Sequence, residues 1–178
     1  ASKEGDFVAE IAPVTIKSRK GEQVVATDET PFQLDIDKIP TLKPAFGKDG
    51  TVTAASSSSI SDGAAAIVLM SESAAKAAGL KPLARLVSYA SHAQAPEWFT
   101  TAPAPSMQKA LDRAGWKVAE VDLFEINEAF ACVAMAAMQD LGLRHDQLNV
   151  NGGACAMGHP VGATGARIIT TLLHALRK

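Results

Sequence analysis

The sequence predicts an α/β fold in which helices flank a largely buried sheet. From residue 64 onward, segments with the pattern of strands alternate with segments with the pattern of helices. The run AAAIVLM at 64–70 is apolar throughout, as a strand buried on both of its faces is. Hydrophobic residues make up 47% of the 178 residues, which is enough for a core.

Residues 1–50 have a different composition from the rest of the chain. They are charged, and Thr, Val and Ile residues surround a glycine turn in FVAEIAPVTIK and GEQVVAT, which predicts a short hairpin. The basic cluster KSRKG at 17–21 is expected to be the solvated turn of this hairpin. Three prolines, at 31, 40 and 44, then predict an irregular stretch. We therefore divide the chain into 1–50 and 51–178.

The second part is expected to contain three strands and four helices. The predicted strands are 64–70, 83–90 and 121–126, and the predicted helices are 71–79, 106–115, 128–142 and 161–178. Ser71 is the expected cap of the first of these helices and Gly79 its stop. The helix at 128–142 is apolar nearly all round, so we expect it to be covered on every side. Because only three strands are predicted beside four helices, we expect the sheet to be incomplete.

Charge and cysteine content exclude several classes of function. The net charge of −2 provides no field for nucleic acid or for an anionic membrane surface. No apolar run reaches the roughly 18 residues of a membrane span. The two cysteines, Cys132 and Cys155, lie in alanine-rich surroundings, which indicates a reducing compartment, and we expect a cytoplasmic location. Cys132 lies in the apolar helix and is expected in the core.

Asn127 lies in EINEAFA, where the third predicted strand ends and a helix begins. At such a junction an asparagine side chain caps the helix by accepting a backbone N–H bond. Spacing alone therefore predicts a helix cap, and a catalytic role for this amide is the alternative.

His159 lies in GHPVGATGAR, between a glycine and a proline and ahead of the last helix. Pro160 favours extended geometry at His159, and the positive end of the helix dipole opposes protonation of the ring. A neutral imidazole can donate to a developing oxyanion or accept the proton of a thiol. The alternatives are a structural histidine and a phosphate-binding glycine loop, although the motif lacks the G-K-[ST] ending of such loops. Cys155 and His159 lack a second pair of ligands, so no metal site is predicted.

Taken together, three long stretches resemble the thiolase family, and within it the acetyl-CoA acetyltransferase branch. They are residues 43–72 (KPAFGKDGTVTAASSSSISDGAAAIVLMSE), 111–131 (LDRAGWKVAEVDLFEINEAFA) and 149–167 (NVNGGACAMGHPVGATGAR). The resemblance implies a thiolase-like layered fold, with 1–50 as the tail of the loop domain. It also implies that 51–178 is the C-terminal domain without its last strands, which leaves an incomplete mixed sheet.

The resemblance also implies roles for particular residues. His159 would activate a nucleophilic cysteine and donate to the thioester oxyanion, and Asn127 would hold a water that completes this oxyanion hole. The residues expected to contact the substrate are Ser58 at the pantetheine arm, Ala45 and Phe46 beside the adenine and pantetheine, Ala129 and Phe130 at the acyl end, and Gly158 beside the histidine.

The implied reaction is the reversible condensation of two acetyl-CoA to acetoacetyl-CoA and coenzyme A, with no cofactor besides coenzyme A as substrate and product. A 3-ketoacyl-CoA thiolase of broader chain length, a thiolase-like acyl-CoA or lipid carrier without turnover, and a structural half-domain are the alternatives. Neither Cys132 nor Cys155 matches a catalytic cysteine of the family. We therefore expect the 178 residues alone to be inactive, their partner to be a missing N-terminal half, and the enzyme to be a homodimer or homotetramer.

Overall fold

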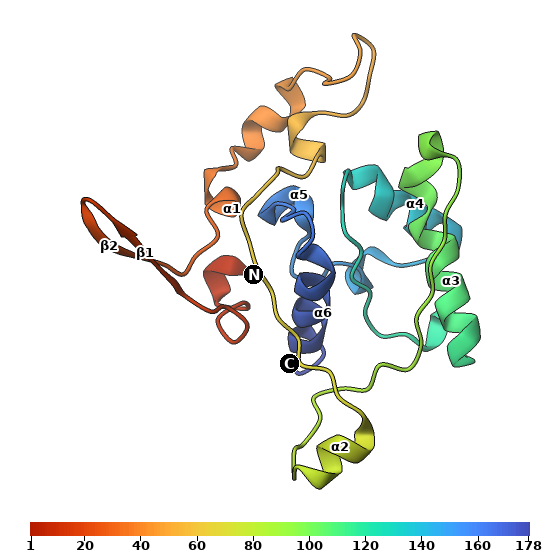
Figure 1. Cartoon of the computed structure of the whole chain (residues 1–178). Helices are drawn as coiled ribbons and strands as arrows, with labels where there is room; N and C mark the ends of the chain where they lie inside the picture. Colours follow the sequence, from red (N-terminus) through yellow and green to blue (C-terminus); the bar gives the residue numbers. More distant parts are fainter.

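The computed structural model describes residues 1–178, and its regular secondary structure is mainly helical (Figure 1). Its α-helices are α1 (Thr30–Gln33), α2 (Glu72–Ala77), α3 (Pro103–Ala114), α4 (Ala131–Leu141), α5 (Ala154–Met157) and α6 (Thr164–Ala175). The strands are β1 (Val14–Ser18) and β2 (Gly21–Val25), and short 3-10 turns lie at Ser2–Glu4, Ile36–Thr41, Ala54–Ser56, Pro96–Thr101, Val118–Glu120 and His145–Gln147. No helix is both long and apolar enough to cross a membrane.

The predicted helices are confirmed, and their ends follow from capping residues. At the start of α2, the Ser71 hydroxyl accepts a hydrogen bond from the Ala74 N–H at 3.2 Å. Helices α3 and α4 end at Gly115 and Gly142, whose φ angles of 70° and 65° are left-handed. Helix α3 starts three residues earlier than 106, at Pro103, because proline fits the first turn of a helix.

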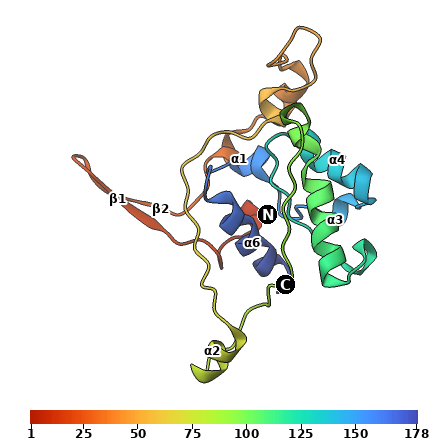
Figure 2. The ribbon, with the colours of Figure 1, turned by 45° about the vertical axis from the view of Figure 1, so that its right-hand side comes forward.

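The predicted hairpin is also confirmed. Strands β1 and β2 pair antiparallel with Val14 opposite Val25 and Ser18 opposite Gly21, so the basic cluster forms the turn. Both strands are almost entirely exposed, and the hairpin projects away from the rest of the chain (Figures 1 and 2).

The strands predicted at 64–70 and 83–90 are not formed. Residues 61–70 and 81–94 make no backbone-to-backbone hydrogen bond, and no strand is assigned there. The apolar side chains of this predicted strand face solvent, with Val68 84% and Leu69 75% exposed. The expectation of a buried strand is wrong for this structure because a strand needs a hydrogen-bonded neighbour, and no other segment of the chain makes backbone hydrogen bonds to this one.

The core lies between α3, α4 and the segments 121–126 and 143–149. Its members are Ala104, Phe124, Ile126, Val133, Ala134, Ala137, Leu143 and Leu148. The third predicted strand is present here as a single parallel bridge between Phe124 and Leu148. The Phe124 N–H donates to the Gln147 carbonyl at 2.7 Å, and the Asn149 N–H donates to the Phe124 carbonyl at 2.9 Å.

Helix α4 is covered on one side only, which corrects two expectations. Val133, Ala134 and Ala137 are buried where α4 packs against α3 and the turn at 96–101. On the other side Met135 is 65% exposed, and Cys132 is exposed rather than in the core. The sequence pattern showed that every face of this helix tolerates burial, but the chain supplies packing partners for only one face.

Candidate functional site

Segment 57–61 brings together the parts of the chain that carry the predicted site residues. On one side of it, the N–H and the hydroxyl of Ser58 both donate to the Ala129 carbonyl, each at 3.2 Å. Ser57 forms an antiparallel bridge with Phe130. Ser58, Ala129 and Phe130, which were predicted separately to contact substrate, are therefore in direct contact.

On its other side, the same segment holds the histidine loop. The His159 N–H donates to the Ser59 carbonyl at 2.8 Å, and Ile60 forms a parallel bridge with His159. Gly158 is buried with φ +92°, and a Cβ atom there would lie 2.0 Å from the Ser61 hydroxyl oxygen. Only glycine fits this position, because both the backbone angle and the close approach exclude a side chain.

An aromatic group lies beside this segment. The ring of Phe130 meets the ring of Phe46 edge to face at a centroid distance of 5.9 Å, and that of Phe99 at 6.2 Å. The Ala45 N–H donates to the Val52 carbonyl at 2.8 Å and so anchors the turn that carries Phe46. Phe46 remains 77% exposed, which leaves an apolar ring on the surface next to Ser58 and Ala129.

Asn127 does not cap a helix. Helix α4 begins at Ala131 with Phe130 as its N-cap, three residues after the position that the pattern suggested. The side-chain oxygen of Asn127 is buried and has no hydrogen-bond partner in the chain. The cap interpretation is therefore wrong, and the amide is free to hold a water or a ligand group, because buried acceptors are normally satisfied.

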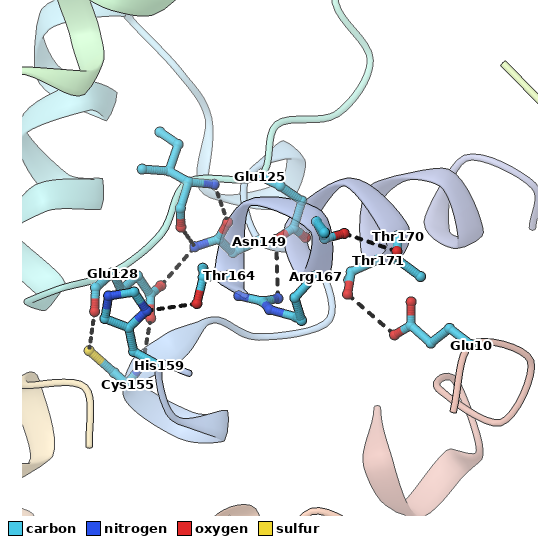
Figure 3. Close-up of polar contacts among 12 residues, drawn as sticks. Glu10, Glu125, Glu128, Asn149, Cys155, His159, Thr164, Arg167, Thr170 and Thr171 are labelled. Atoms are coloured by element: carbon cyan, nitrogen blue, oxygen red, sulfur yellow. Dashed lines mark hydrogen bonds and ion pairs between the residues drawn. The ribbon is translucent and has the colours of Figure 1, made fainter. Parts of the chain in front are cut away.

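The ring of His159 makes one polar contact within the chain. Its Nδ1 atom lies 2.7 Å from the hydroxyl oxygen of Thr164, the first residue of α6 (Figure 3). The Nε2 atom makes no hydrogen bond to any other residue of the chain. The side chain is half-buried, so the ring is oriented on one edge and open on the other. Sequence reasoning missed Thr164, although its position one turn after Pro160 is a helical spacing.

A second polar network, also missed from sequence, joins Asn127's neighbour Glu128 to the loop that leads to His159. One carboxylate oxygen of Glu128 accepts from the Asn149 amide at 2.9 Å, and the other accepts from the Cys155 N–H at 3.1 Å (Figure 3). Asn149 also bonds both the N–H and the carbonyl of Ile126, at 2.8 and 3.0 Å. A Cβ atom on Gly153 would lie 2.3 Å from the Glu128 carboxyl carbon. These contacts fix the NEAF segment against the glycine loop.

Glu125 and Arg167 form a further pair of charged groups near these contacts (Figure 3). An Nη atom of Arg167 lies 3.9 Å from a carboxylate oxygen of Glu125, close enough for attraction but too far for an N–H···O bond. Burial raises the pKa of Glu125 to about 7, and the Arg167 charge opposes this shift. Because Arg167 lies in α6 and Glu125 precedes Asn127 by two residues, the pair links the two predicted catalytic segments.

Neither cysteine is prepared to act as a nucleophile. Burial, followed by the charge of the nearby Glu128 carboxylate, raises the pKa of the Cys155 thiol to about 12, so this thiol stays protonated at neutral pH. Cys132 lies on the exposed face of α4, away from the core.

Two surface cavities lie elsewhere. The larger is lined by residues of the 118–122 turn and of the end of α4, among them Val118 and Gly142, and the other lies between the N-terminal residues and Met157. The polar groups able to do chemistry lie around segment 57–61 and do not line these cavities.

Comparison with known proteins places this arrangement in a family. Residues 1–73 match the family described as thiolase, N-terminal domain, and residues 80–178 match thiolase, C-terminal domain. A probable acetyl-CoA acetyltransferase of Dictyostelium discoideum is 53% identical over 99% of the chain and 43% of its own length. The crystal structure of the Bacillus anthracis acetyl-CoA acetyltransferase superposes with a TM-score of 0.94 at 45% identity, over 98% of the chain and 45% of its own. The crystal structure of human mitochondrial 3-ketoacyl-CoA thiolase superposes with a TM-score of 0.87 at 37% identity, over 98% of the chain and 45% of its own length.

These structures confirm the predicted fold class, although the chain itself forms only the two-stranded sheet. The chain spans somewhat less than half the length of the relatives that it matches. The division at residue 50 stays a prediction, as do the roles given to the individual site residues.

Proposed function

The chain belongs to the thiolase family, and on that premise we propose that the whole protein is an acetyl-CoA acetyltransferase. It would join two acetyl-CoA molecules into acetoacetyl-CoA and free coenzyme A, and would catalyse the reverse thiolysis. Relatives that are 53% and 51% identical to this chain are named probable acetyl-CoA acetyltransferase and acetyl-CoA acetyltransferase, which supports this branch over thiolases that accept longer chains.

The observation that carries the proposal is the meeting of three segments, far apart in sequence, at residues 57–61. The segment bonds Ala129 on one side and His159 on the other, so one short stretch positions the NEAF and GHP motifs together. The Nε2 atom of His159 and the buried amide oxygen of Asn127 both lack a hydrogen-bond partner in the chain, which favours this function over a structural histidine or a phosphate-binding loop.

In the proposed reaction, each step builds negative charge on a thioester oxygen. The Nε2 side of His159, which no residue of the chain occupies, would donate to that oxygen. The buried amide oxygen of Asn127 would accept a hydrogen bond from a water, and the second O–H of this water would donate to the thioester oxygen. Donors placed in advance stabilise an oxyanion more than bulk water does, because they need no reorganisation when the charge develops.

We place the nucleophile outside these 178 residues. The raised pKa makes the Cys155 thiol unsuitable for attack on a thioester, and the Cys132 thiol has no hydrogen bond to a base that would activate it. The proposed nucleophilic cysteine and the second, acid–base cysteine therefore lie in parts of the protein that match the remaining length of its relatives and are not included in these 178 residues.

The substrate contacts follow from the aromatic group and the serine. Ser58 would bond the pantetheine arm of coenzyme A, with Ala45 and Phe46 packing beside the arm and the adenine. Ala129, Phe130 and Gly158 would line the acyl end. We further propose a cytoplasmic homodimer or homotetramer that uses no metal and takes part in fatty acid metabolism.

The test is thiolysis of acetoacetyl-CoA by the complete protein and by its His159→Ala variant. Loss of one acid–base or oxyanion group costs about 100-fold or more in turnover, so we expect a drop of at least that size. His145→Ala, a change at an exposed histidine, is the matched control and should leave the rate unaffected. Unchanged turnover in His159→Ala would contradict the assigned role.

Two further measurements separate the alternatives. A ratio of kcat/KM for acetoacetyl-CoA over a longer 3-ketoacyl-CoA above one supports the acetyl branch, and a ratio below one supports a broader thiolase. A protein that binds acyl-CoA but shows no iodoacetamide-reactive cysteine in the part beyond this chain would be a carrier without turnover.

A further inference from the structure

Thr164 is placed to control the proton on the His159 ring. It is only 5% exposed, and it begins α6, a helix of twelve residues. Its hydroxyl oxygen lies near two possible partners: Nδ1 of His159 at 2.7 Å and the carbonyl oxygen of Pro160 at 3.2 Å. A hydroxyl has a single proton to donate, so at any moment it donates to only one of them.

The carbonyl of Pro160 is the less favourable acceptor of that hydrogen bond. It already accepts the N–H groups of Ala163 at 2.9 Å and Thr164 at 3.1 Å, which occupy both of its lone pairs. The contact to Nδ1 is also the shorter of the two. The hydroxyl proton therefore goes to Nδ1, and in the neutral ring the remaining proton then sits on Nε2.

We propose that Thr164 is a positioning residue that holds neutral His159 in the tautomer with its proton on Nε2. The inference rests on the proposed function and deepens it, because Nε2–H is the group that would face the thioester oxyanion. Without the hydroxyl, Nδ1 and Nε2 compete for the single proton, and the fraction of enzyme ready to donate to an oxyanion falls.

A hydroxyl can also stabilise the opposite tautomer, in which the proton is on Nδ1, because it can accept as well as donate a hydrogen bond. Turned toward the Pro160 carbonyl, the Thr164 hydroxyl accepts from Nδ1–H and leaves the Nε2 lone pair open to the proton of a thiol. One residue thus supports the ring both as an oxyanion donor and as a base, while the resting state is the donor form.

The first test reads the tautomer directly. The complete protein is labelled with ¹⁵N-histidine, and the ring nitrogens of His159 are assigned by their loss in His159→Gln. We expect an unprotonated Nδ1 and a protonated Nε2 in the unmodified protein and in Thr164→Ser, and a mixture in Thr164→Val. A resting Nδ1–H form, or a Thr164→Val spectrum like that of the unmodified protein, would overturn the proposal.

The matched control is Thr170→Val, in the same helix. The Thr170 hydroxyl donates to the Ala166 carbonyl at 2.9 Å, and it makes no hydrogen bond to His159. This variant should keep the tautomer of the unmodified protein. A shift of the His159 signals in Thr170→Val would show that any lost hydroxyl in α6 disturbs the ring, and would overturn the specific role of Thr164.

The second test is kinetic. Loss of one ordinary hydrogen bond corresponds to about tenfold in rate, so kcat for acetoacetyl-CoA thiolysis should fall about tenfold in Thr164→Val, with KM within about twofold. Thr164→Ser should recover most of the rate. Equal losses in both variants would indicate a packing role and contradict the proposal. If the unmodified protein does not cleave acetoacetyl-CoA, the proposed function fails, while the NMR result still decides the role of Thr164.

Discussion

The two halves of the chain, 1–102 and 103–178, are built from similar amounts of apolar residue but bury them very differently. Of the 18 buried residues, only Phe7 and Ala75 lie before residue 103. The second half packs α3, α4 and two chain segments around one core, whereas the first half consists of a projecting hairpin, the short helices α1 and α2, 3-10 turns and extended segments (Figure 2). Whether a segment is buried therefore depends on the other segments that pack against it, and not on its composition.

The halves contact each other at segment 57–61 as well as at the turn 96–101, and the candidate site depends on the first of these contacts. This segment belongs to the open half, yet it bonds Ala129 and His159 of the packed half. The candidate site thus lies where an exposed segment is held by contacts to a folded core. Three predictions test this comparison.

The largest expected effect comes from one substitution made in each half. Leu148→Ala removes a side chain that is 5% exposed in the core and should lower the free energy of unfolding by about 2–5 kcal/mol. Leu69→Ala, at a side chain 75% exposed, should change it by less than about 0.5 kcal/mol. Urea unfolding of the 178-residue chain measures both. A large cost at Leu69 would show that segment 61–70 is covered in solution, and would break the comparison.

A somewhat smaller effect is expected from pH, within the packed half. Because the pKa of Glu125 is raised to about 7 in the folded chain, the folded state keeps a proton that the unfolded chain loses above about pH 4.5. Stability should therefore be greatest at low pH, fall by up to about 3 kcal/mol as pH rises to about 7, and then level off.

Unfolding of Glu125→Gln at several pH values checks this slope. The variant should lose most of the decline between about pH 4.5 and 7, since its amide does not titrate there. Glu97→Gln, at an exposed carboxyl, is the control and should keep the slope. A Glu125→Gln variant with the original pH dependence would show that other groups cause it.

The smallest effect tests the junction between the halves. Gly158 and Gly162 both have φ +92°, but only a Cβ at 158 meets another residue, Ser61. Gly162→Ala should cost about 1 kcal/mol from backbone strain, and Gly158→Ala about 1–2 kcal/mol more from the collision. Adding Ser61→Gly should recover part of this excess. Equal costs for the two alanine variants would mean that segment 57–61 is not held against the histidine loop.

Local features were predictable because their causes lie close together in sequence. Ser71 and the glycines at 115 and 142 mark helix ends through contacts within a few residues. The hairpin at 14–25 follows from strand formers around one turn. His159 was selected by its own neighbours, a glycine and a proline.

Features that need a distant partner were not predictable in the same way. The Glu128 carboxylate bonds groups 21 and 27 residues away, and nothing in the local pattern indicates them. The apolar surroundings of Cys132 and of residues 64–70 predicted burial, yet Cys132, Val68 and Leu69 are exposed. Asn127 was expected as a helix cap, but α4 begins four residues later, which leaves its oxygen buried and unpaired.

By itself, the sequence determined the helices, their ends, the hairpin and the family, because capping, periodicity and long motifs are all read from neighbouring residues. Only the tertiary structure decided that Ser58, Ala129 and His159 meet on one segment, and that Thr164 holds the ring. It also decided which apolar runs are buried. The reason is physical: a hydrogen bond or an apolar contact stabilises the fold only when its partner is present, and sequence patterns record what a residue prefers rather than which partner it meets.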